Sequence, residues 1–232
     1  MELLSLSDSF EVKIVKRLNR FVVLVQKDGQ LLRAHNTNTG RLKEFLVEGK
    51  RAFCLPKSGG KTDCRLFAIE DPFGFALIDT TLQMKAFEEA FRKGLIPWLQ
   101  PSRWKGFKRN HRVGNSLIDY LFWNEREDFL LEVKSAAMRS KDNFGMYPDC
   151  PTERGRKHLR ELLNHTDRAG VLFICALPKV KGFKPYCEGD PEICKLLSTA
   201  KEKGLTLRAI SIFFDENTKK VVLENPDLRV GV

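Results

Sequence analysis

Three residues near the middle of the chain have side chains suited to phosphoryl chemistry. Glu132 and Lys134 lie in the apolar run "FLLEVKSA", and Asp119 lies in the preceding apolar run "NSLIDYLFWN". Successive strand residues point to opposite faces of a sheet, so Glu132 and Lys134 share one face and Val133 takes the other. If the two runs pair antiparallel across the turn "EREDF", Asp119 comes close to Glu132.

Such a group has two interpretations. Two carboxylates and the carbonyl of Val133 make a hard-oxygen ligand set suited to Mg²⁺ or Mn²⁺. A lysine beside that site orients a water molecule and stabilises the charge that develops on a phosphorane-like transition state. The competing interpretation is a plain salt bridge between Glu132 and Lys134, because a charge on a mostly buried strand needs a partner. We predict the metal site, with Asp119, Glu132 and Val133 as ligands and Lys134 as a catalytic residue.

The elements that position these residues indicate two domains. Residues 1–80 contain many short β-rich runs separated by turn signals, which predicts a small OB-like β-barrel, with a helical turn at residues 41–47. Residues 81–232 then follow the order helix, three strands, helix, strand, helix, strand, which is typical of an α/β domain with a mixed central sheet. The three helices are expected in "TTLQMKAFEEAFRKGL", "PTERGRKHLRELLNH" and "PEICKLLSTAKEKG".

A basic segment, "SRWKGFKRNHR" (102–112), precedes the Asp119 run and contains no acidic residue. Its cations are interleaved with Trp104 and Phe107, a combination that nucleic-acid grooves use for phosphate contacts and base stacking. The alternative is a solvated charged strand whose aromatic rings face the core. The nucleic-acid-binding residues predicted in this segment are Arg103, Lys105, Lys108, Arg109 and Arg112.

The composition sets the broad class. The chain has 232 residues, 42% of them hydrophobic and 17 of them Phe, which indicates a folded globule. The formal net charge of +10 fits a polyanionic partner such as nucleic acid. No apolar stretch is long enough for a membrane span and the N-terminal residues lack a secretion-signal layout, so we expect a cytoplasmic protein without a membrane partner.

The six cysteines show no metal-binding pattern, because no Cys-x-x-Cys and no paired Cys/His spacing occurs. Cys175 is expected to be a buried apolar thiol. Two pairings, Cys54 with Cys64 and Cys187 with Cys194, are open as disulfides, although cytosolic disulfides are rare outside hyperthermophiles.

Four segments together resemble a known family. They are "HNTNTG", "IDYL", "LEVKSA" and "YPDCPTERGRKHLREL", and in this order they span most of the chain. They resemble the SfsA family, named for sugar fermentation stimulation protein A. An Asp followed on the next strand by Glu-x-Lys and then by a helix also resembles the PD-(D/E)xK nuclease core. The resemblance implies an OB-like domain joined to a PD-(D/E)xK-like domain that binds DNA. One departure is Thr37, where family members usually carry a proline.

The resemblance also implies roles for further residues. Arg154, Lys157 and His158 lie three and four apart on the predicted helix, and we expect them to hold a phosphate beside the metal. His158 is also assigned a catalytic role, because histidine transfers protons near neutral pH. The polar loop "RAHNTNTG" is expected to face the site, with three residues donating hydrogen bonds to a phosphate or base: Asn36, Asn38 and Thr39. Asp149 is a further carboxylate for the site. Glu88 and Glu89 are expected on the surface, the alternative being that one of them supplies the acid that many such nucleases carry on the first helix.

We therefore predict a DNA-binding protein with a metal-dependent phosphodiesterase site that uses Mg²⁺ or Mn²⁺. The alternative is a non-catalytic DNA-binding transcriptional regulator of sugar metabolism on the same fold. The sequence leaves open whether RNA is also a substrate, and it leaves open the oligomeric state, a homodimer being one option.

Overall fold

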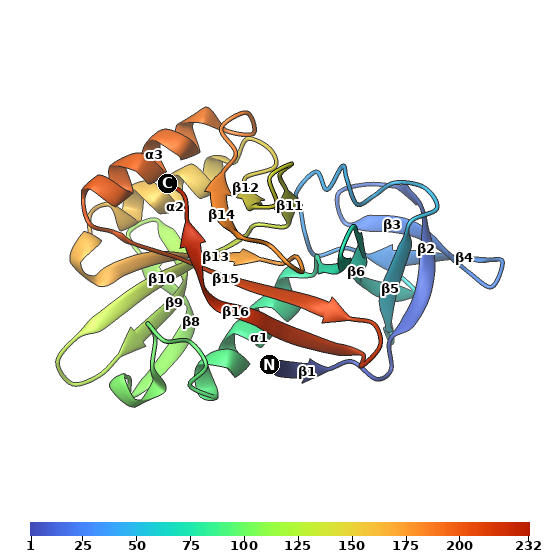
Figure 1. The fold of residues 1–232 in the computed structure, drawn as a ribbon, viewed down its shortest axis with the longest axis horizontal. Coiled ribbons are helices and arrows are strands. Elements are labelled where there is room, and N and C mark those ends of the chain that lie inside the picture. The colour runs from blue at the N-terminus through green and yellow to red at the C-terminus, as the bar shows by residue number, and fades with distance from the viewer.

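The computed structural model describes residues 1–232, which form a small β-barrel beside a larger α/β half (Figure 1). Antiparallel pairings join β2 to β3, β3 to β4, β5 to β6 and β2 to β5, and a parallel pairing of β4 with β6 closes the ring. This closed five-stranded barrel confirms the predicted N-terminal fold. Its strands are β2 (Phe10–Arg17), β3 (Val22–Lys27), β4 (Gln30–His35), β5 (Arg51–Pro56) and β6 (Cys64–Asp71).

The α/β half is built on a mixed sheet, as predicted. Its strands run in the order β8-β9-β10-β13-β15-β16, with parallel pairing at β10–β13 and β13–β15 and antiparallel pairing elsewhere. The strands are β8 (Gly106–Val113), β9 (Ser116–Trp123), β10 (Asp128–Ser135), β13 (Ala169–Cys175), β15 (Thr206–Asp215) and β16 (Lys220–Val230).

Short elements complete this half. β1 pairs with β16 at the edge of the sheet, and a small branch of three strands also joins β16. The sequence patterns predicted neither these four short strands nor β16. The four short strands are β1 (Glu2–Ser5), β11 (Met138–Arg139), β12 (Gly145–Tyr147) and β14 (Gly182–Pro185), and two 3₁₀ turns lie at η1 (Pro101–Arg103) and η2 (Thr166–Arg168).

Three α-helices form where the sequence predicts them, each with a side-chain cap at its N-terminus. Asp79 caps α1 by accepting from the Leu82 amide, and Thr152 caps α2. Asp190 caps α3, whose first residue is a proline that needs no amide partner. None of the three has the length and apolar character needed to span a membrane. The helices are α1 (Thr80–Arg92), α2 (Glu153–Leu162) and α3 (Pro191–Glu202).

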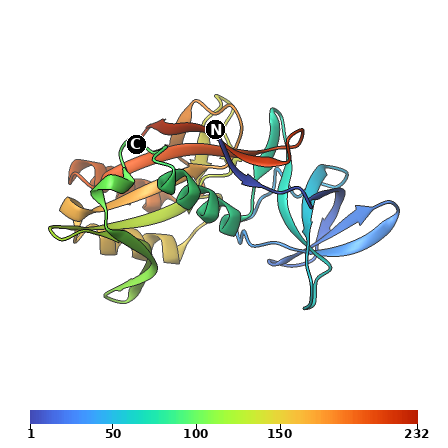
Figure 2. The same cartoon turned by 90° about the horizontal axis from the view of Figure 1, so that it is seen from below.

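The helices α1 and α2 cover opposite faces of the sheet at β10. Gln83 of α1 donates to the hydroxyl of Ser135 at 3.0 Å, whereas His158 of α2 contacts Glu132. Because odd and even residues of a strand point to opposite sides, these contacts put α1 and α2 on different faces. Figure 2 shows α1 crossing one side of the sheet. Glu132 and Lys134 therefore point to the α2 face, as predicted.

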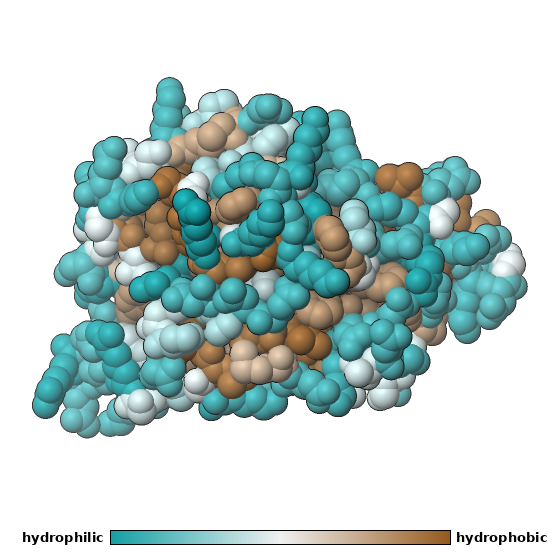
Figure 3. Space-filling view, in the orientation of Figure 1, coloured by the Kyte–Doolittle hydropathy of each residue, from teal (hydrophilic) through white to brown (hydrophobic).

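One strand joins the barrel to the α/β half. β7 (Gly74–Leu77) pairs with β6 of the barrel and with β15 of the larger sheet, so the hydrogen-bonded sheet is continuous. Aromatic rings from both sides pack around this junction: the Phe53 and Phe75 centroids lie 5.0 Å apart and those of Phe67 and Phe214 lie 4.9 Å apart. A single cluster of buried side chains spans both halves. The face of the molecule in Figure 3 is largely hydrophilic, with hydrophobic patches between the charged side chains.

Candidate active site

The site forms where β9 and β10 separate. Their antiparallel backbone pairing extends as far as Tyr120 opposite Leu131. Beyond this pair, backbone amides of the two strands donate to side-chain carboxylates instead of to backbone carbonyls. The Val133 amide donates to Asp119 Oδ2 at 2.8 Å, and the Asp119 amide donates to Glu132 Oε2 at 3.4 Å. The two carboxylates therefore face each other across the gap between the strands, in the register that the sequence predicted.

Glu132 is held from two sides. Lys134 Nζ donates to Glu132 Oε1 at 2.5 Å, and His158 Nδ1 lies 2.5 Å from the same oxygen. The exposed fractions of the three residues are 2% for Glu132, 9% for Lys134 and 3% for His158. Burial raises the pKa of Glu132, but the charges and hydrogen bonds of Lys134 and His158 outweigh it, so its pKa lies below the usual range. Burial lowers the pKa of Lys134, but Glu132 outweighs this and raises it, so both groups are charged at neutral pH.

Asp119 behaves differently from Glu132. Burial and the nearby charge of Glu132 raise the pKa of Asp119 to about 6, against the opposing effects of Lys134 and the Val133 amide. Two facing carboxylates that repel each other fit a divalent cation, because its charge would offset that repulsion and its preferred ligands are oxygens. No group of three or more His, Cys, Asp and Glu side chains is arranged to hold a metal. A metal here would therefore need the carbonyl of Val133, water or ligand oxygens to complete its coordination.

The carboxylates open into a cavity of about 500 Å³ between the barrel and the α/β half. Its walls are the barrel loop 37–42, β10 and the segment 146–155 that leads into α2. At Asp119 and Val133 it meets a smaller cavity of about 280 Å³, which extends to Arg109 and Asn110 of β8. We call the two together the groove. A larger cavity of about 850 Å³ lies at the other end of β9 and β10 and contains none of the predicted catalytic residues.

Comparison with known proteins identifies the family. The family model "Sugar fermentation stimulation protein RE domain" matches residues 81–218, and "SfsA N-terminal OB domain" matches residues 15–78. A sugar fermentation stimulation protein homolog of Archaeoglobus fulgidus is 46% identical over 234 residues, covering 100% of both chains. A homolog from Pyrococcus furiosus is 44% identical over 218 residues, covering 93% of this chain and 94% of its own.

The chain belongs to the SfsA family. A solved structure described as Pyrococcus furiosus SfsA in complex with Ca²⁺ matches with a TM-score of 0.92 and 41% identity, covering 100% of both chains. The agreement extends over the barrel and the α/β half together.

In this SfsA-family chain, α2 brings one of its three predicted phosphate ligands to the groove. Arg154 lines the groove, and its side chain takes part in no salt bridge or hydrogen bond. Lys157 Nζ donates instead to the Asn115 carbonyl at 2.7 Å, outside the groove. His158 is buried against Glu132, so it does not reach a phosphate in the groove. Its role is revised from phosphate contact to holding Glu132 in place.

The barrel loop faces the groove as predicted, but its asparagines have another role. Asn36 is fully buried and donates to the Asn38 carbonyl at 2.6 Å. Asn38 lines the groove, but its amide nitrogen donates to the Ile78 carbonyl at 3.2 Å and its oxygen accepts from the Gly40 amide at 3.0 Å. The prediction that these amides contact a phosphate or base is therefore corrected, because backbone groups of the loop and of Ile78 already use them. Thr39 is exposed and lines the groove.

The basic segment 102–112 is only partly available to a ligand. Its two rings pack inward, Trp104 against Phe122 and Phe107 against Phe91, so neither is a stacking surface. Three of its five predicted cations pair with acids, and Lys108 and Arg112 make no salt bridge. The pairs are Arg103 with Glu127, Lys105 with Glu125, and Arg109 with Glu88.

Glu88 was expected at the surface and is instead buried, with an exposed fraction of 5%. It accepts from the Tyr120 hydroxyl at 2.8 Å and binds the Arg109 guanidinium. Burial raises the pKa of Glu88, but these bonds outweigh it and the net shift is downward. Glu88 thus fixes Arg109 at the β8 end of the groove. The sequence carried a signal for this burial, because Glu88 lies three residues before Phe91 and therefore on the buried ridge of α1.

Two groove residues, Arg20 and Tyr147, were not singled out from the sequence, although Tyr147 begins one of the segments that resemble the family. Arg20 lies in the turn between β2 and β3 and has no ionic partner. Tyr147 lies close enough to Lys134 for the two to affect each other's pKa, and burial raises the pKa of its hydroxyl. The Tyr147 hydroxyl also packs against Gly155, where a Cβ atom would come within 2.5 Å of it. Glycine is therefore required at this position of α2.

Asp149 links the two halves at the edge of the groove. Its Oδ2 accepts from the Leu42 amide at 3.0 Å. A Cβ atom on Gly40 would lie 2.6 Å from the same carboxylate, so a glycine is needed for the barrel loop to approach it. Asp149 therefore binds a backbone amide of the barrel, and its placement as a further metal ligand is not supported by a contact with Asp119 or Glu132.

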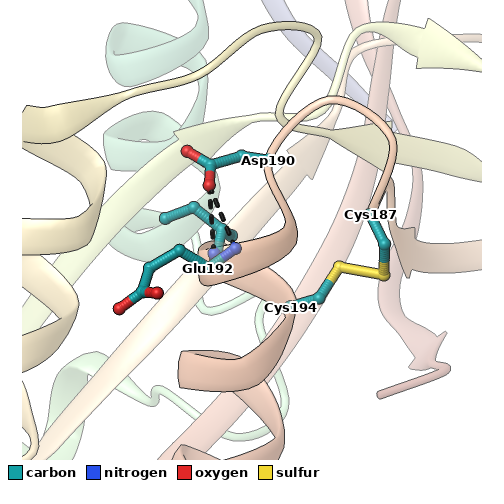
Figure 4. Close-up of a disulfide and its surroundings, with 5 residues drawn as sticks. Cys187, Asp190, Glu192 and Cys194 are labelled. Carbon is teal, nitrogen blue, oxygen red and sulfur yellow. Dashed lines mark hydrogen bonds between the residues drawn. A yellow bond between two sulfur atoms is a disulfide. The ribbon is translucent and has the colours of Figure 1, made fainter.

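Cys187 and Cys194 form a disulfide at the start of α3 (Figure 4). Cys54 and Cys64 are free and buried. Cys175 is a buried thiol, as expected. The disulfide spans the turn that contains Asp190, whose carboxylate caps α3 and also accepts from the Thr152 amide at 2.9 Å. Asp190 thus joins the first turns of α3 and α2, and α2 presents Arg154 and His158.

Proposed function

We propose that this SfsA-family chain binds DNA in the groove and hydrolyses its phosphodiester bonds with a divalent metal held by Asp119 and Glu132. The observation that carries the proposal is the separation of β9 and β10, where two facing carboxylates and Lys134 open into one groove with Arg154. A surface that only bound DNA would gain nothing from a carboxylate pair, because without a metal the pair repels phosphate.

The metal assignment has two supports. Burial and the repulsion by Glu132 together raise the pKa of Asp119, and a cation would relieve the repulsion. The related Pyrococcus furiosus SfsA was solved in complex with Ca²⁺, a hard cation that prefers oxygen ligands, as Mg²⁺ does. When bound, Mg²⁺ or Mn²⁺ would supply a Lewis acid that polarises a phosphoryl oxygen and lowers the pKa of water.

Three residues of the chain have separate roles beside the metal ligands. Lys134 is held by Glu132 beside the carboxylates, where its ammonium can orient a water molecule and stabilise negative charge on the phosphate. His158 is a positioning residue, because it fixes Glu132 without facing the groove. Arg154, in the first turn of α2, is the group that binds a phosphate beside the reacting one. Its side chain is not paired, so no ion pair has to be broken first.

DNA is the proposed partner because Arg20 and Arg154 line the groove without acidic partners and the chain has a formal net charge of +10. RNA has the same phosphate chemistry, and an assay with both polymers separates them. The non-catalytic regulator is the alternative outcome of the same assay.

The experiment is a cleavage assay on labelled single-stranded and double-stranded DNA and on RNA, with Mn²⁺, Mg²⁺ or EDTA. We expect metal-dependent cleavage that falls at least about 100-fold in Asp119→Asn and Glu132→Gln, because each removes a charged ligand. Asp167→Asn is the matched control, because this carboxylate lies at the larger cavity, away from the groove. Binding of DNA without cleavage in any metal would favour the regulator and contradict the nuclease proposal.

A further inference from the structure

The turn between β2 and β3 places an exposed aromatic ring beside the groove. Phe21 is 51% exposed and Leu18, at the start of the same turn, is 44% exposed. The neighbouring Arg20 lines the groove, and its guanidinium carbon lies 6.0 Å from the centroid of the Phe21 ring. The ring is therefore within reach of whatever the Arg20 guanidinium contacts.

A single side chain fixes this turn to the barrel loop of the groove. The Arg17 guanidinium donates to carbonyls on both segments: Gly40 and Arg41 at 2.8 Å each, Arg20 at 3.0 Å and Asn19 at 3.1 Å. Arg17 is thus occupied by the backbone and is not available to a phosphate.

Phe21 itself is held through its backbone. Its amide donates to Asn19 Oδ1 at 2.9 Å, and its carbonyl accepts from the Asn36 amide at 2.8 Å. An exposed ring on a turn fixed at both ends loses little conformational entropy on binding a ligand. Exposure of a large apolar side chain in a rigid position, beside an unpaired cation, is typical of a contact surface.

We propose that Phe21 is a stacking surface for an unpaired base, and that the strand bound in the groove is single-stranded where it passes the barrel. The inference rests on the proposed function, which supplies the nucleic acid. Arg20 would contact the phosphate next to the stacked base, and Thr39 lies on the same wall of the groove. A duplex keeps its base faces stacked inside the helix, so only an unpaired base can cover the Phe21 ring.

The test compares binding of full-length wild type and Phe21→Ala to labelled single-stranded and duplex oligonucleotides of equal length, by fluorescence anisotropy at low salt with Ca²⁺ as the only divalent cation. We expect Phe21→Ala to weaken single-strand binding about tenfold, the loss of one base–aromatic stack, and to change duplex binding less than about twofold. Phe21→Trp should retain single-strand affinity, because an indole stacks as well as a phenyl ring.

Leu31→Ala is the matched control, because Leu31 is 55% exposed on the same barrel but lies beside the β3–β4 turn, away from the α/β half (Figure 1). It should bind both oligonucleotides as wild type does. Unchanged single-strand affinity in Phe21→Ala, or an equal loss on duplex, would overturn the stacking inference and leave the proposed function standing. Conversion of a dimer to a monomer with unchanged affinity would overturn it in favour of a protein contact. Wild type that bound neither oligonucleotide would overturn the proposed function and this inference together.

Discussion

At the floor of the groove the charged side chains are paired, whereas the two arginines at its rim are not. The floor consists of Asp119, Glu132 and Lys134, which are bonded to one another or to backbone amides. The rim includes Arg20 and Arg154, which line the same groove without an ion pair, and the exposed carboxylates of Glu44 and Glu153. Floor residues are paired because an unpaired buried charge is costly. The arginines at the rim need no ionic partner, because water solvates their charges.

This contrast separates the stability of the fold from the affinity for a polyanion, two properties that mutations usually change together. A change at the floor should alter stability and metal binding, because it leaves a buried charge without its partner. A change at the rim should alter affinity for a polyanion and leave stability almost unchanged. The predictions below test this separation.

The largest effect is expected for Lys134→Ala in the absence of metal. The substitution leaves Glu132 and Asp119 facing each other without the ammonium, so the free energy of unfolding should fall by about 3–5 kcal/mol. Mn²⁺ at 100 times its dissociation constant should restore about 2.7 kcal/mol, because it binds the folded state alone. Urea unfolding with EDTA or Mn²⁺ measures both quantities.

Lys157→Ala is the control for Lys134→Ala, because Lys157 is an exposed lysine bonded to a carbonyl outside the groove. It should change stability by less than about 0.5 kcal/mol. A large loss in Lys134→Ala that Mn²⁺ does not reduce, together with a wild type that Mn²⁺ does not stabilise, would identify the floor as an ordinary salt bridge.

An intermediate effect is expected from pH on the metal-free protein. The pKa of Asp119 is about 6 in the folded state, above its value of 3.8 in an unfolded chain. The folded state therefore binds the Asp119 proton more tightly than the unfolded state does. The stability that protonated Asp119 contributes is fully present below pH 4 and is lost as pH rises through 6. Between pH 4 and pH 7 wild type in EDTA should lose about 2 kcal/mol relative to Asp119→Asn, which has no proton to lose.

The measurement is urea unfolding of both proteins across this pH range. A difference between wild type and Asp119→Asn that stays constant with pH would show that neither burial nor Glu132 raises the pKa of Asp119 in the folded state.

The smallest effect on stability is expected at the rim. Arg154→Gln should leave the free energy of unfolding within about 0.5 kcal/mol of wild type. It should also reduce the slope of log affinity for DNA against log salt by about 1, because one phosphate contact is lost. Arg103→Gln provides the comparison, since Arg103 is paired with Glu127 at 2.8 Å and should change the slope less. Equal slopes for both variants would remove the distinction between paired and unpaired arginines.

The sequence predicted those parts of the molecule that depend on local periodicity. Alternation along the strand put Glu132 and Lys134 on one face, and one hairpin register put Asp119 opposite Glu132. Helix periodicity located α1, α2 and α3, and dense turn signals located the barrel. Each of these features depends on neighbours in the chain or on a single hairpin.

The rest could not be predicted because charge pairing depends on distant segments. Arg109 and its partner Glu88 are 21 residues apart, and the Asp149 carboxylate meets an amide 107 residues away. No local pattern distinguishes Arg103, which is paired, from Arg154, which is not. Asn36 shows the same limit, since a polar loop residue is predicted to be exposed unless the fold buries it.

The strand β7 has a consequence for how the protein folds. It belongs to the barrel through β6 and to the larger sheet through β15, and the Phe53, Phe67, Phe75 and Phe214 rings fill the junction. Neither half can unfold without leaving one edge of β7 unpaired and these rings exposed to water. The two halves are distinct in architecture, but we expect them to unfold in one cooperative transition, so that the groove between them exists only when both are folded.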